Sequence, residues 1–277
     1  MNTVLTYSPR DFIQEIATEL GITVTTHSND YITRLTMGNK TRHVLWSNWD
    51  INPATADRIA CDKSACYEIL SHCQVPAIPH HLLMHPSRRQ GWTPLAGTWA
   101  TAVAFFEEYH HSVVIKPNLG TNGHGIYHCT TIQELEAATH AIFETSPDAA
   151  LCPFYEIATE YRIFHINGKT PLIYGKTPSP DNWRHNLSQG ATAFEVDNHS
   201  PQAESLKKIA LAAAKAININ FATIDIAQLA DGSLMVMEIN SGVQARQLLE
   251  QHPHLHGVVR DMYRDAVLGM FNGGNPC

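Results

Sequence analysis

The sequence lacks the features that mark several large classes of protein. Its six cysteines form no CxxC pair and no Cys/His zinc spacing, so we expect buried, reduced thiols. No apolar run is long enough to span a membrane, and no basic-then-apolar segment opens the chain, so we expect a cytoplasmic protein with no membrane partner. The net charge is −7 and there is no run of Lys or Arg, so we expect no nucleic-acid partner.

What the chain does have is length and apolar content. It is 277 residues long and 44% hydrophobic, which is enough for one compact two-lobed unit or two small domains. There are no repeats and no low-complexity tracts. Several of the 17 histidines cluster at 80–81, 110–111 and 252–256, but these stretches are polar and loop-like. We therefore expect these histidines not to bind a metal.

Helical and strand-like patterns alternate along the chain, which predicts an α+β fold. Residues 76–94 are rich in Pro, His and Arg and predict a connecting segment, and 177–200 predict an irregular stretch. The predicted helices cover 9–20, 62–73, 99–109, 131–143, 202–217 and 258–270, and the predicted strands cover 22–26, 31–37, 43–46, 112–116, 126–129, 160–166, 172–175, 221–227 and 233–239.

The most informative local pattern is a pair of strands joined at Asp231-Gly232. This dipeptide predicts a type I′ hairpin turn, because that turn needs positive φ at both central positions. Paired residues of such a hairpin have a constant index sum, which places Asp225 opposite Glu238. Asn240 follows two residues later on the same face.

Two facing carboxylates repel each other unless a cation lies between them. Oxygen ligands of this kind suit Mg²⁺. The alternative is a surface hairpin with two solvated acids. The apolar neighbours of Asp225 and Glu238 make both strands look buried and favour the metal site.

A second pattern is a glycine-rich loop between two short strands. Gly120, Gly123 and Gly125 follow Lys116, which ends an apolar strand. Backbone N–H groups of such a loop can approach phosphate oxygens, and a lysine there favours an anion. The loop lacks the GK[ST] ending of a Walker motif. An ordinary mobile turn is the alternative.

Further charged residues stand at positions that suit an anionic ligand. Glu160 and Arg162 alternate on one strand and share a face. Arg184 and Asn186 lie in a polar loop, and Lys63 opens a helix, where a cation is poorly placed without a nearby anion. For each of them a solvated surface position is the alternative.

Taken together and in this order, these motifs and the segment 153–157 resemble the ATP-grasp superfamily, in its RimK-type carboxylate–amine ligase branch. The resemblance spans roughly residues 60–245. It implies two α+β lobes with ATP between them and an N-terminal α/β segment that is shorter than usual. The implied domains are an N-terminal segment (1–75), a small lobe with the glycine-rich lid (76–150) and a C-terminal lobe with the metal site (151–277).

The resemblance also implies a role for each matching residue. Pro153 and Phe154 depart from it, since many members have Gln-Glu there. The implied catalytic residues are Lys116, Arg162 and Arg184; the implied ATP contacts are Lys63, Lys116, Gly120, Gly123, Gly125, Phe154, Tyr155, Glu160, Arg162 and Asn186; and the implied ligands of two Mg²⁺ ions, with Mn²⁺ as a substitute, are Asp225, Glu238 and Asn240.

The implied reaction joins a carboxylate to an amine through an acylphosphate, with small molecules or peptides as substrates. Self-association into a homo-oligomer is left open by the sequence. Residues 241–246 are expected to line the acceptor pocket, where Arg246 is either a carboxylate anchor or a surface residue. His124 and His185 are the candidate general bases. An ATP-grasp phosphotransferase and a nucleotide-binding regulator without turnover are the two alternatives.

Overall fold

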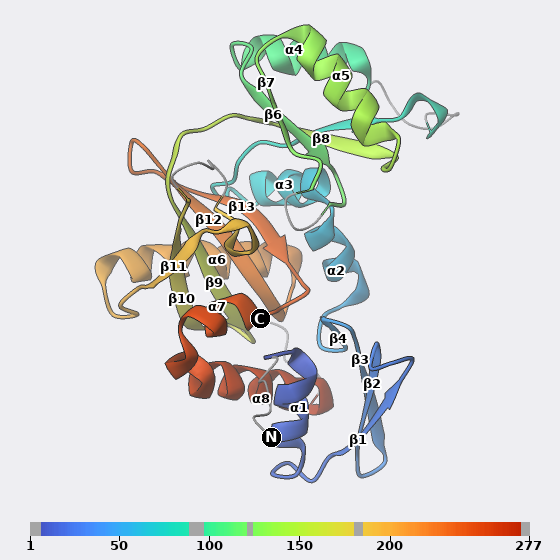
Figure 1. Cartoon of the computed structure of the whole chain (residues 1–277), viewed down its shortest axis with the longest axis vertical. Coiled ribbons are helices and arrows are strands. Elements are labelled where there is room, and N and C mark those ends of the chain that lie inside the picture. Colours follow the sequence, from blue (N-terminus) through green and yellow to red (C-terminus); the bar gives the residue numbers. More distant parts are fainter. Residues whose placement is uncertain (1–6, 89–96, 121–123, 180–184, 273–277) are drawn as a thin grey trace.

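The structure is a computed structural model, and it describes residues 7–88, 97–120, 124–179 and 185–272. It consists of three sheets and their covering helices, arranged along one long axis (Figure 1). None of the helices in the described ranges is long and apolar enough to cross a membrane.

The central sheet has five antiparallel strands in the order β11-β10-β9-β12-β13. Helix α6 (Pro201–Ile217) packs on one face of this sheet, begins at the Ser200 N-cap and ends at Asn218 in the left-handed conformation. The strands are β9 (Ile157–Ile166), β10 (Lys169–Thr177), β11 (Thr192–Glu195), β12 (Phe221–Leu229) and β13 (Leu234–Asn240).

The face of the central sheet toward α6 is apolar. Alternate residues such as Ile163 and Ile224 contribute to one core with the alanine-rich side of α6. Two short helices, α2 (Ala54–Cys61) and α3 (Lys63–His72), join this core. Residues 76–78 then run beside β13, where the Ile78 N–H donates to the Val236 carbonyl at 2.9 Å.

The N-terminal segment packs on the opposite face of the central sheet, at one end of it. Its elements share a core with the C-terminal helices, and Trp49 stacks on Tyr263 at 5.4 Å between ring centroids. Residues from 12–51 and from 164–271 therefore share one core. The elements are α1 (Pro9–Ala17), β1 (Thr23–His27), β2 (Ile32–Met37), β3 (Lys40–Leu45) and β4 (Asn48–Trp49), against α7 (Arg246–Gln251), η3 (Pro253–Leu255) and α8 (His256–Asn272).

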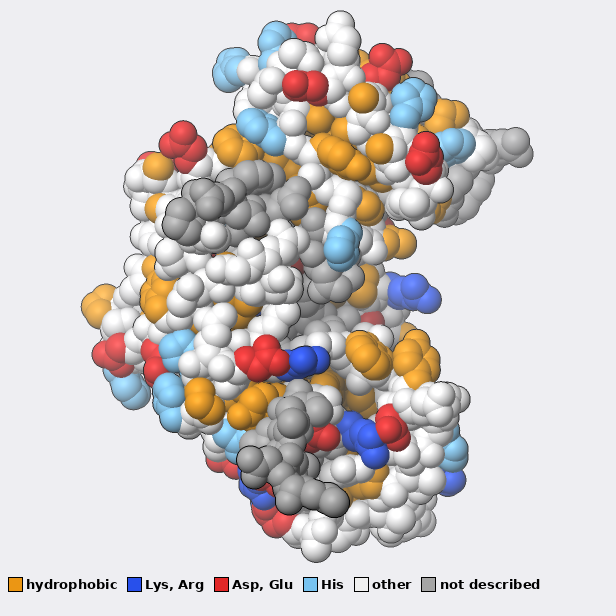
Figure 2. Space-filling model, in the orientation of Figure 1, with side chains coloured by type: hydrophobic (Ala, Val, Ile, Leu, Met, Phe, Trp, Pro, Cys, Tyr) orange, Lys and Arg blue, Asp and Glu red, His pale blue; other side chains and the backbone are white. Residues whose placement is uncertain are grey.

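The third sheet forms a small lobe above the central sheet, and the molecular outline is indented below this lobe (Figures 1 and 2). Its antiparallel order is β5-β8-β6-β7, with two helices packed on it. The elements are β5 (His81–Met84), η1 (Pro86–Arg88), α4 (Trp99–Glu108), β6 (Val113–Pro117), β7 (Tyr127–Cys129), α5 (Ile132–Phe143) and β8 (Asp148–Pro153); a further short turn, η2 (Leu187–Gln189), precedes β11.

The acid hairpin has the predicted pairing but a different turn. Asp225 pairs with Glu238, as predicted. The type I′ prediction is wrong, because Gly232 has a φ of 84° and Asp231 is absent from the positive-φ residues. Leu229 and Ser233 instead close a three-residue loop, which shifts the register by one. A register shift between Asp225 and Ile226 restores the predicted partners.

Two of the strands that sequence patterns missed depend on distant partners. Strand β5 lies inside the predicted connecting segment, and β11 lies inside the predicted irregular stretch. Each has four residues. Strand β5 pairs with β8, far along the chain, and β11 lies at the edge of the central sheet. Local periodicity in so short a segment cannot identify a strand.

Helix α8 allows a matched test of the shared core. A Cβ at Gly269 would lie 2.5 Å from Ile51 Cδ1 and 2.9 Å from Asn167 Nδ2, whereas a Cβ at Gly257 on the same helix would meet nothing within 4 Å. We expect Gly269→Ala to lower the free energy of unfolding by about 1–3 kcal/mol through overpacking. Gly257→Ala should be neutral or slightly stabilising. Equal midpoints of the two variants in urea unfolding would contradict the packing described.

Candidate functional site

A row of charged residues crosses four strands on the face of the central sheet that is opposite α6. Lys176 on β10 pairs with Glu160 on β9, Arg162 on β9 pairs with Asp225 on β12, and Asp225 pairs with Glu238 on β13. Alternation along the strands puts all five side chains on one face. The aromatic core of the N-terminal segment covers the other end of this face.

Four of these groups form a buried ion cluster. Arg162 donates to both oxygens of the Asp225 carboxylate, at 2.7 Å from Nε and 2.6 Å from Nη2. Lys176 donates to Glu160 and lies 3.4 Å from Asp225 Oδ1. The side chains of Lys176 and Asp225 are each 3% exposed. Lys176 was absent from the predicted site residues.

The cluster shifts the pKa of both acids, in opposite directions. Burial alone would raise the pKa of Asp225, but the adjacent Arg162 and Lys176 outweigh it and hold the pKa at about 2. For Glu160, burial and the neighbouring Asp225 raise the pKa above its ordinary value despite the contact with Lys176. Of the two acids in the cluster, Asp225 is therefore the one that stays ionised to the lower pH.

This cluster corrects one premise of the sequence argument. Asp225 and Glu238 face each other, but Asp225 already has two cationic partners, so relief of the repulsion does not require a metal ion. The two acids Glu160 and Asp225 balance the two bases Arg162 and Lys176. In the described part of the chain, Glu238 makes no ion pair.

Asn240 connects the two facing carboxylates. Its amide nitrogen lies 3.3 Å from Asp225 Oδ2 and 3.1 Å from Glu238 Oε1. The two carboxylates and the Oδ1 of Asn240 are oxygen ligands of the kind that Mg²⁺ prefers, whereas here Asn240 turns its Nδ2 toward the carboxylates. The three predicted metal ligands are thus brought together, with Glu238 and Asn240 half-buried.

The start of the glycine-rich loop is tied to the beginning of α3. Lys63 Nζ donates to the Gly120 carbonyl at 2.6 Å. Asn118, which is 1% exposed, accepts from the Ser64 N–H at 3.1 Å and donates to Asp62 Oδ1 at 2.8 Å. Asp62 in turn caps α3 through the Ala65 N–H. Sequence reasoning missed Asn118.

Lys63 and Lys116 lie close enough together for the charge of one to act on the other. Burial lowers the pKa of Lys63, Glu238 raises it and Lys116 lowers it again. Among the described residues, the Lys116 side chain makes no hydrogen bond and no ion pair. His80 is buried beside them; its Nδ1 lies 2.8 Å from the Ile78 carbonyl oxygen, and its Nε2 has no partner. Burial, followed by the charge of Lys116, holds the pKa of His80 well below its ordinary value.

A cavity beside these groups is lined by both α3 and β13, including Lys63, His80 and Glu238. An apolar cluster of Ile78, Val114, Cys152 and Ala227 lies between the central sheet and the small lobe. Tyr155 and Met237 pack against this cluster. The arrangement offers an apolar surface next to an anion-attracting one, between the two lobes.

One backbone hydrogen bond bears on the ATP contact predicted for Phe154. The Phe154 N–H donates to the Ser112 carbonyl at 3.0 Å, so this N–H does not face a ligand. The Phe154 ring stacks on His128 with 3.9 Å between centroids. The ATP contacts predicted for Phe154 and Tyr155 stay predictions. So does the ATP contact predicted for Glu160, which the resemblance implies is made to the ribose and which here contacts Lys176.

The remaining predicted residues either lie outside the described ranges or lie away from the ion cluster. Arg184 and Gly123 lie outside the described residues. Asn186 precedes η2, and His185 is buried with Nδ1 3.0 Å from the Lys176 carbonyl. The remaining predicted positions are more exposed: Gly125 has a φ of 67°, His124 is exposed, and Arg246 forms a surface ion pair with Glu250 at 2.8 Å.

Comparison with known proteins identifies the fold. D-Alanine–D-alanine ligase from Bacillus anthracis has a TM-score of 0.60 at 17% identity, over 80% of this chain and 70% of that chain. A bifunctional glutathione synthetase from Pasteurella multocida has a TM-score of 0.56 at 14% identity, over 93% of this chain and 44% of that chain. The fold is the ATP-grasp fold, as predicted.

The family model of the RimK-like ATP-grasp domain matches residues 62–252, and the chain belongs to this family. A probable alpha-L-glutamate ligase from Aeromonas salmonicida is 30% identical over 131 residues, which are 47% of this chain and 42% of that protein. One from Marinobacter nauticus is 31% identical over the same shares. The matched segment thus spans less than half of each relative.

The ion cluster predicts a large cost for removing one partner. Arg162→Met leaves Asp225 buried without its bidentate partner, and we expect the free energy of unfolding to fall by about 3–5 kcal/mol. Arg246→Met removes an exposed ion pair and should cost at most about 1 kcal/mol. Urea unfolding at neutral pH measures the change in the free energy of unfolding for both variants. The same small loss in both variants would show that the cluster does not stabilise the sheet.

The depressed pKa of Asp225 predicts a loss of stability in acid. Its ordinary pKa is 3.8 and its folded value is about 2, so over this range the unfolded state binds more protons. The Asp225 carboxylate therefore stabilises the fold fully at pH values above 3.8, and this stabilisation is lost as the pH falls toward 2. Urea unfolding across this range should show a steeper decline for wild type than for Asp225→Asn. Parallel declines would contradict the assignment.

Proposed function

We propose that this protein is an ATP-dependent ligase that joins a carboxylate to an amine, with release of ADP and phosphate. The observation that carries the proposal is the distribution of charge between the two lobes. Lys116 is without a carboxylate partner among the described residues, and Lys63 is near Glu238. A polyphosphate supplies the anionic partner that Lys116 lacks among the described residues.

In the proposed first step, a substrate carboxylate oxygen attacks the γ-phosphorus of ATP, and the bond from that phosphorus to the ADP oxygen breaks. Lys63 and Lys116 bind the phosphates, and Lys116 stabilises the charge on the transferring group. Arg184, which the family resemblance places here, shares this role. Arg162 acts indirectly, because its guanidinium positions the Asp225 carboxylate.

Mg²⁺, expected as two ions with Mn²⁺ as a substitute, neutralises phosphate charge when bound. Glu238 and Asn240 would hold it with Asp225. The cluster around Asp225 fixes that carboxylate in place, since Arg162 binds both of its oxygens. Lys176, at the other end of the row, contacts Glu160 and Asp225.

In the second step, the amine nitrogen attacks the acyl carbon, the amide bond forms, and phosphate leaves with the electron pair of the C–O bond. The amine gives up its proton to a base. Of the two candidates, His185 is buried against the Lys176 carbonyl and His124 is exposed in the glycine-rich loop. His124 is therefore the freer of the two to accept a proton.

An amino-acid substrate is supported by the relatives named alpha-L-glutamate ligases. Residues 241–246 directly follow the metal ligands and would line the acceptor side. Arg246, however, is exposed and paired with Glu250, which favours its surface reading over the carboxylate anchor. The alternative functions are a phosphotransferase that releases a phosphorylated product and a nucleotide-binding regulator without turnover.

Hydroxylamine separates these alternatives. With Mg-ATP and a panel of amino acids, an acylphosphate should be intercepted as a hydroxamate, with about one ADP per hydroxamate. Lys116→Met should lower kcat about 100- to 1,000-fold, because it removes a cation from the transferring group. Coupled ADP release and mass spectrometry give both quantities.

Lys169→Met is the matched control, since Lys169 is 73% exposed and forms only a surface pair with Asp265 at 3.6 Å. Its activity should equal that of wild type. A phosphorylated product without hydroxamate would establish the phosphotransferase instead. Nucleotide binding without ADP release for any amino-acid pair would favour the regulator.

A further inference from the structure

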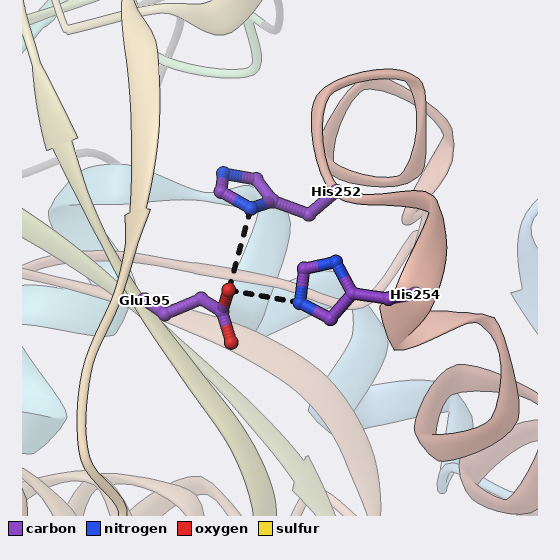
Figure 3. Close-up of side chains that lie close together, drawn as sticks. All are labelled: Glu195, His252 and His254. Carbon is purple, nitrogen blue, oxygen red and sulfur yellow. Dashed lines mark hydrogen bonds and ion pairs between the residues drawn. The ribbon is translucent and has the colours of Figure 1, made fainter.

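A cluster outside the proposed ligase site brings together two histidines and one glutamate. Glu195 ends β11, His252 follows α7, and His254 lies in η3. One ligand atom from each lies within 4.8 Å of the other two. Figure 3 shows the three side chains pointing toward one another, from the strand on one side and the helical segment on the other.

The contact made by Nε2 of His252 determines whether its Nδ1 carries a proton or a lone pair. Its Nε2 lies 3.0 Å from the Ala193 carbonyl oxygen, so Nε2 carries the proton. In the neutral ring, Nδ1 then holds a lone pair, which faces Glu195 Oε1 at 3.5 Å. A lone pair opposite a carboxylate oxygen is unfavourable unless a proton or a metal ion lies between them.

The distance from His252 to Glu195 favours a metal ion over a proton, while the distance from His254 to Glu195 is that of a hydrogen bond. A charge-assisted N–H···O bond is normally about 2.7–2.9 Å long. The 3.5 Å between His252 Nδ1 and Glu195 Oε1 is longer than that. Two ligands about 2.0 Å from a tetrahedral metal lie about 3.3 Å apart. His254 Nε2, 2.8 Å from the same oxygen, needs only a small shift to complete the set.

The surroundings of the cluster also resemble those of a metal site. Histidines that bind metals usually donate their second ring N–H to a carbonyl or carboxylate, as His252 does to Ala193. Gln251 fixes the same strand, since it accepts from the Ala193 N–H at 2.7 Å and donates to the Ala191 carbonyl at 3.2 Å. The edge strand β11 is thereby already held against α7.

We propose that Glu195, His252 and His254 bind a transition-metal ion, of which Zn²⁺ fits the two-nitrogen, one-oxygen donor set best. The ion clamps β11 to the segment after α7. Three protein ligands leave one coordination position for water. This assignment reverses the expectation from sequence that the histidines at 252–256 bind no metal. The site does not use the Mg²⁺ ligands and is independent of the proposed ligase activity.

The test is a calorimetric Zn²⁺ titration of the chelator-treated full-length protein, without nucleotide. We expect about one saturable site per chain. His254→Ala and Glu195→Gln should abolish it, while His199→Ala should retain it, since His199 is an exposed histidine four residues beyond Glu195. Glu238→Gln should also retain it, which separates this site from the proposed Mg²⁺ site.

A stability measurement provides the second readout. Zn²⁺ should raise the melting temperature of wild type and His199→Ala by mass action, but not that of His254→Ala. His254 is 59% exposed, so its removal should leave the fold intact in the absence of Zn²⁺. No Zn²⁺ binding by wild type, or equal binding by His254→Ala, would overturn the proposal and leave the cluster as a proton-bridged ion pair.

Discussion

The bidentate contact between Arg162 and Asp225 is the interaction on which the candidate site depends. It links two neighbouring strands in the middle of the central sheet, on the face turned away from α6. Lys176 and Glu160 extend it by one strand. Because the four charges cancel, the sheet can bury them, and the polar face continues outward to Glu238 and Asn240. The rest of the site is arranged around this neutral centre.

The second organising feature is the attachment of the glycine-rich loop to α3. Asn118 joins the end of β6 to the cap of α3, and Lys63 reaches from the helix to the Gly120 carbonyl. The small lobe and the central sheet therefore meet through a hydrogen-bonded network as well as an apolar cluster. A ligand that binds Lys63 would act on the loop directly. This gives a physical route from nucleotide binding to loop position.

The metal proposal and the ligase proposal concern the same face of the central sheet at different places, since Glu195 pairs with Tyr174, two residues from Lys176 on β10. The candidate ligase site uses the polar row from Lys176 to Glu238, whereas the proposed Zn²⁺ site uses the end of the edge strand. The loop with Asn186 leads directly into that strand. A clamp at Glu195 would thus hold one end of a segment whose other end, at His185, lies against the Lys176 carbonyl.

Sequence alone determined what depends on local spacing: most helices, the long strands, and the facing of Asp225 and Glu238 with Asn240 beside them. It also located Lys63, Lys116 and the glycine-rich loop, because motif order along the chain resembles that of the family. Tertiary structure decided the partners. Lys176 pairs with Glu160, Arg162 neutralises Asp225, and Asn118 joins two elements, all through contacts between distant residues. Short strands such as β5 and β11, and the cluster of His252 and His254 with Glu195, likewise exist only because the folded chain brings their partners together. Periodicity reports which face a side chain occupies, and only the packing of distant segments determines what it meets there.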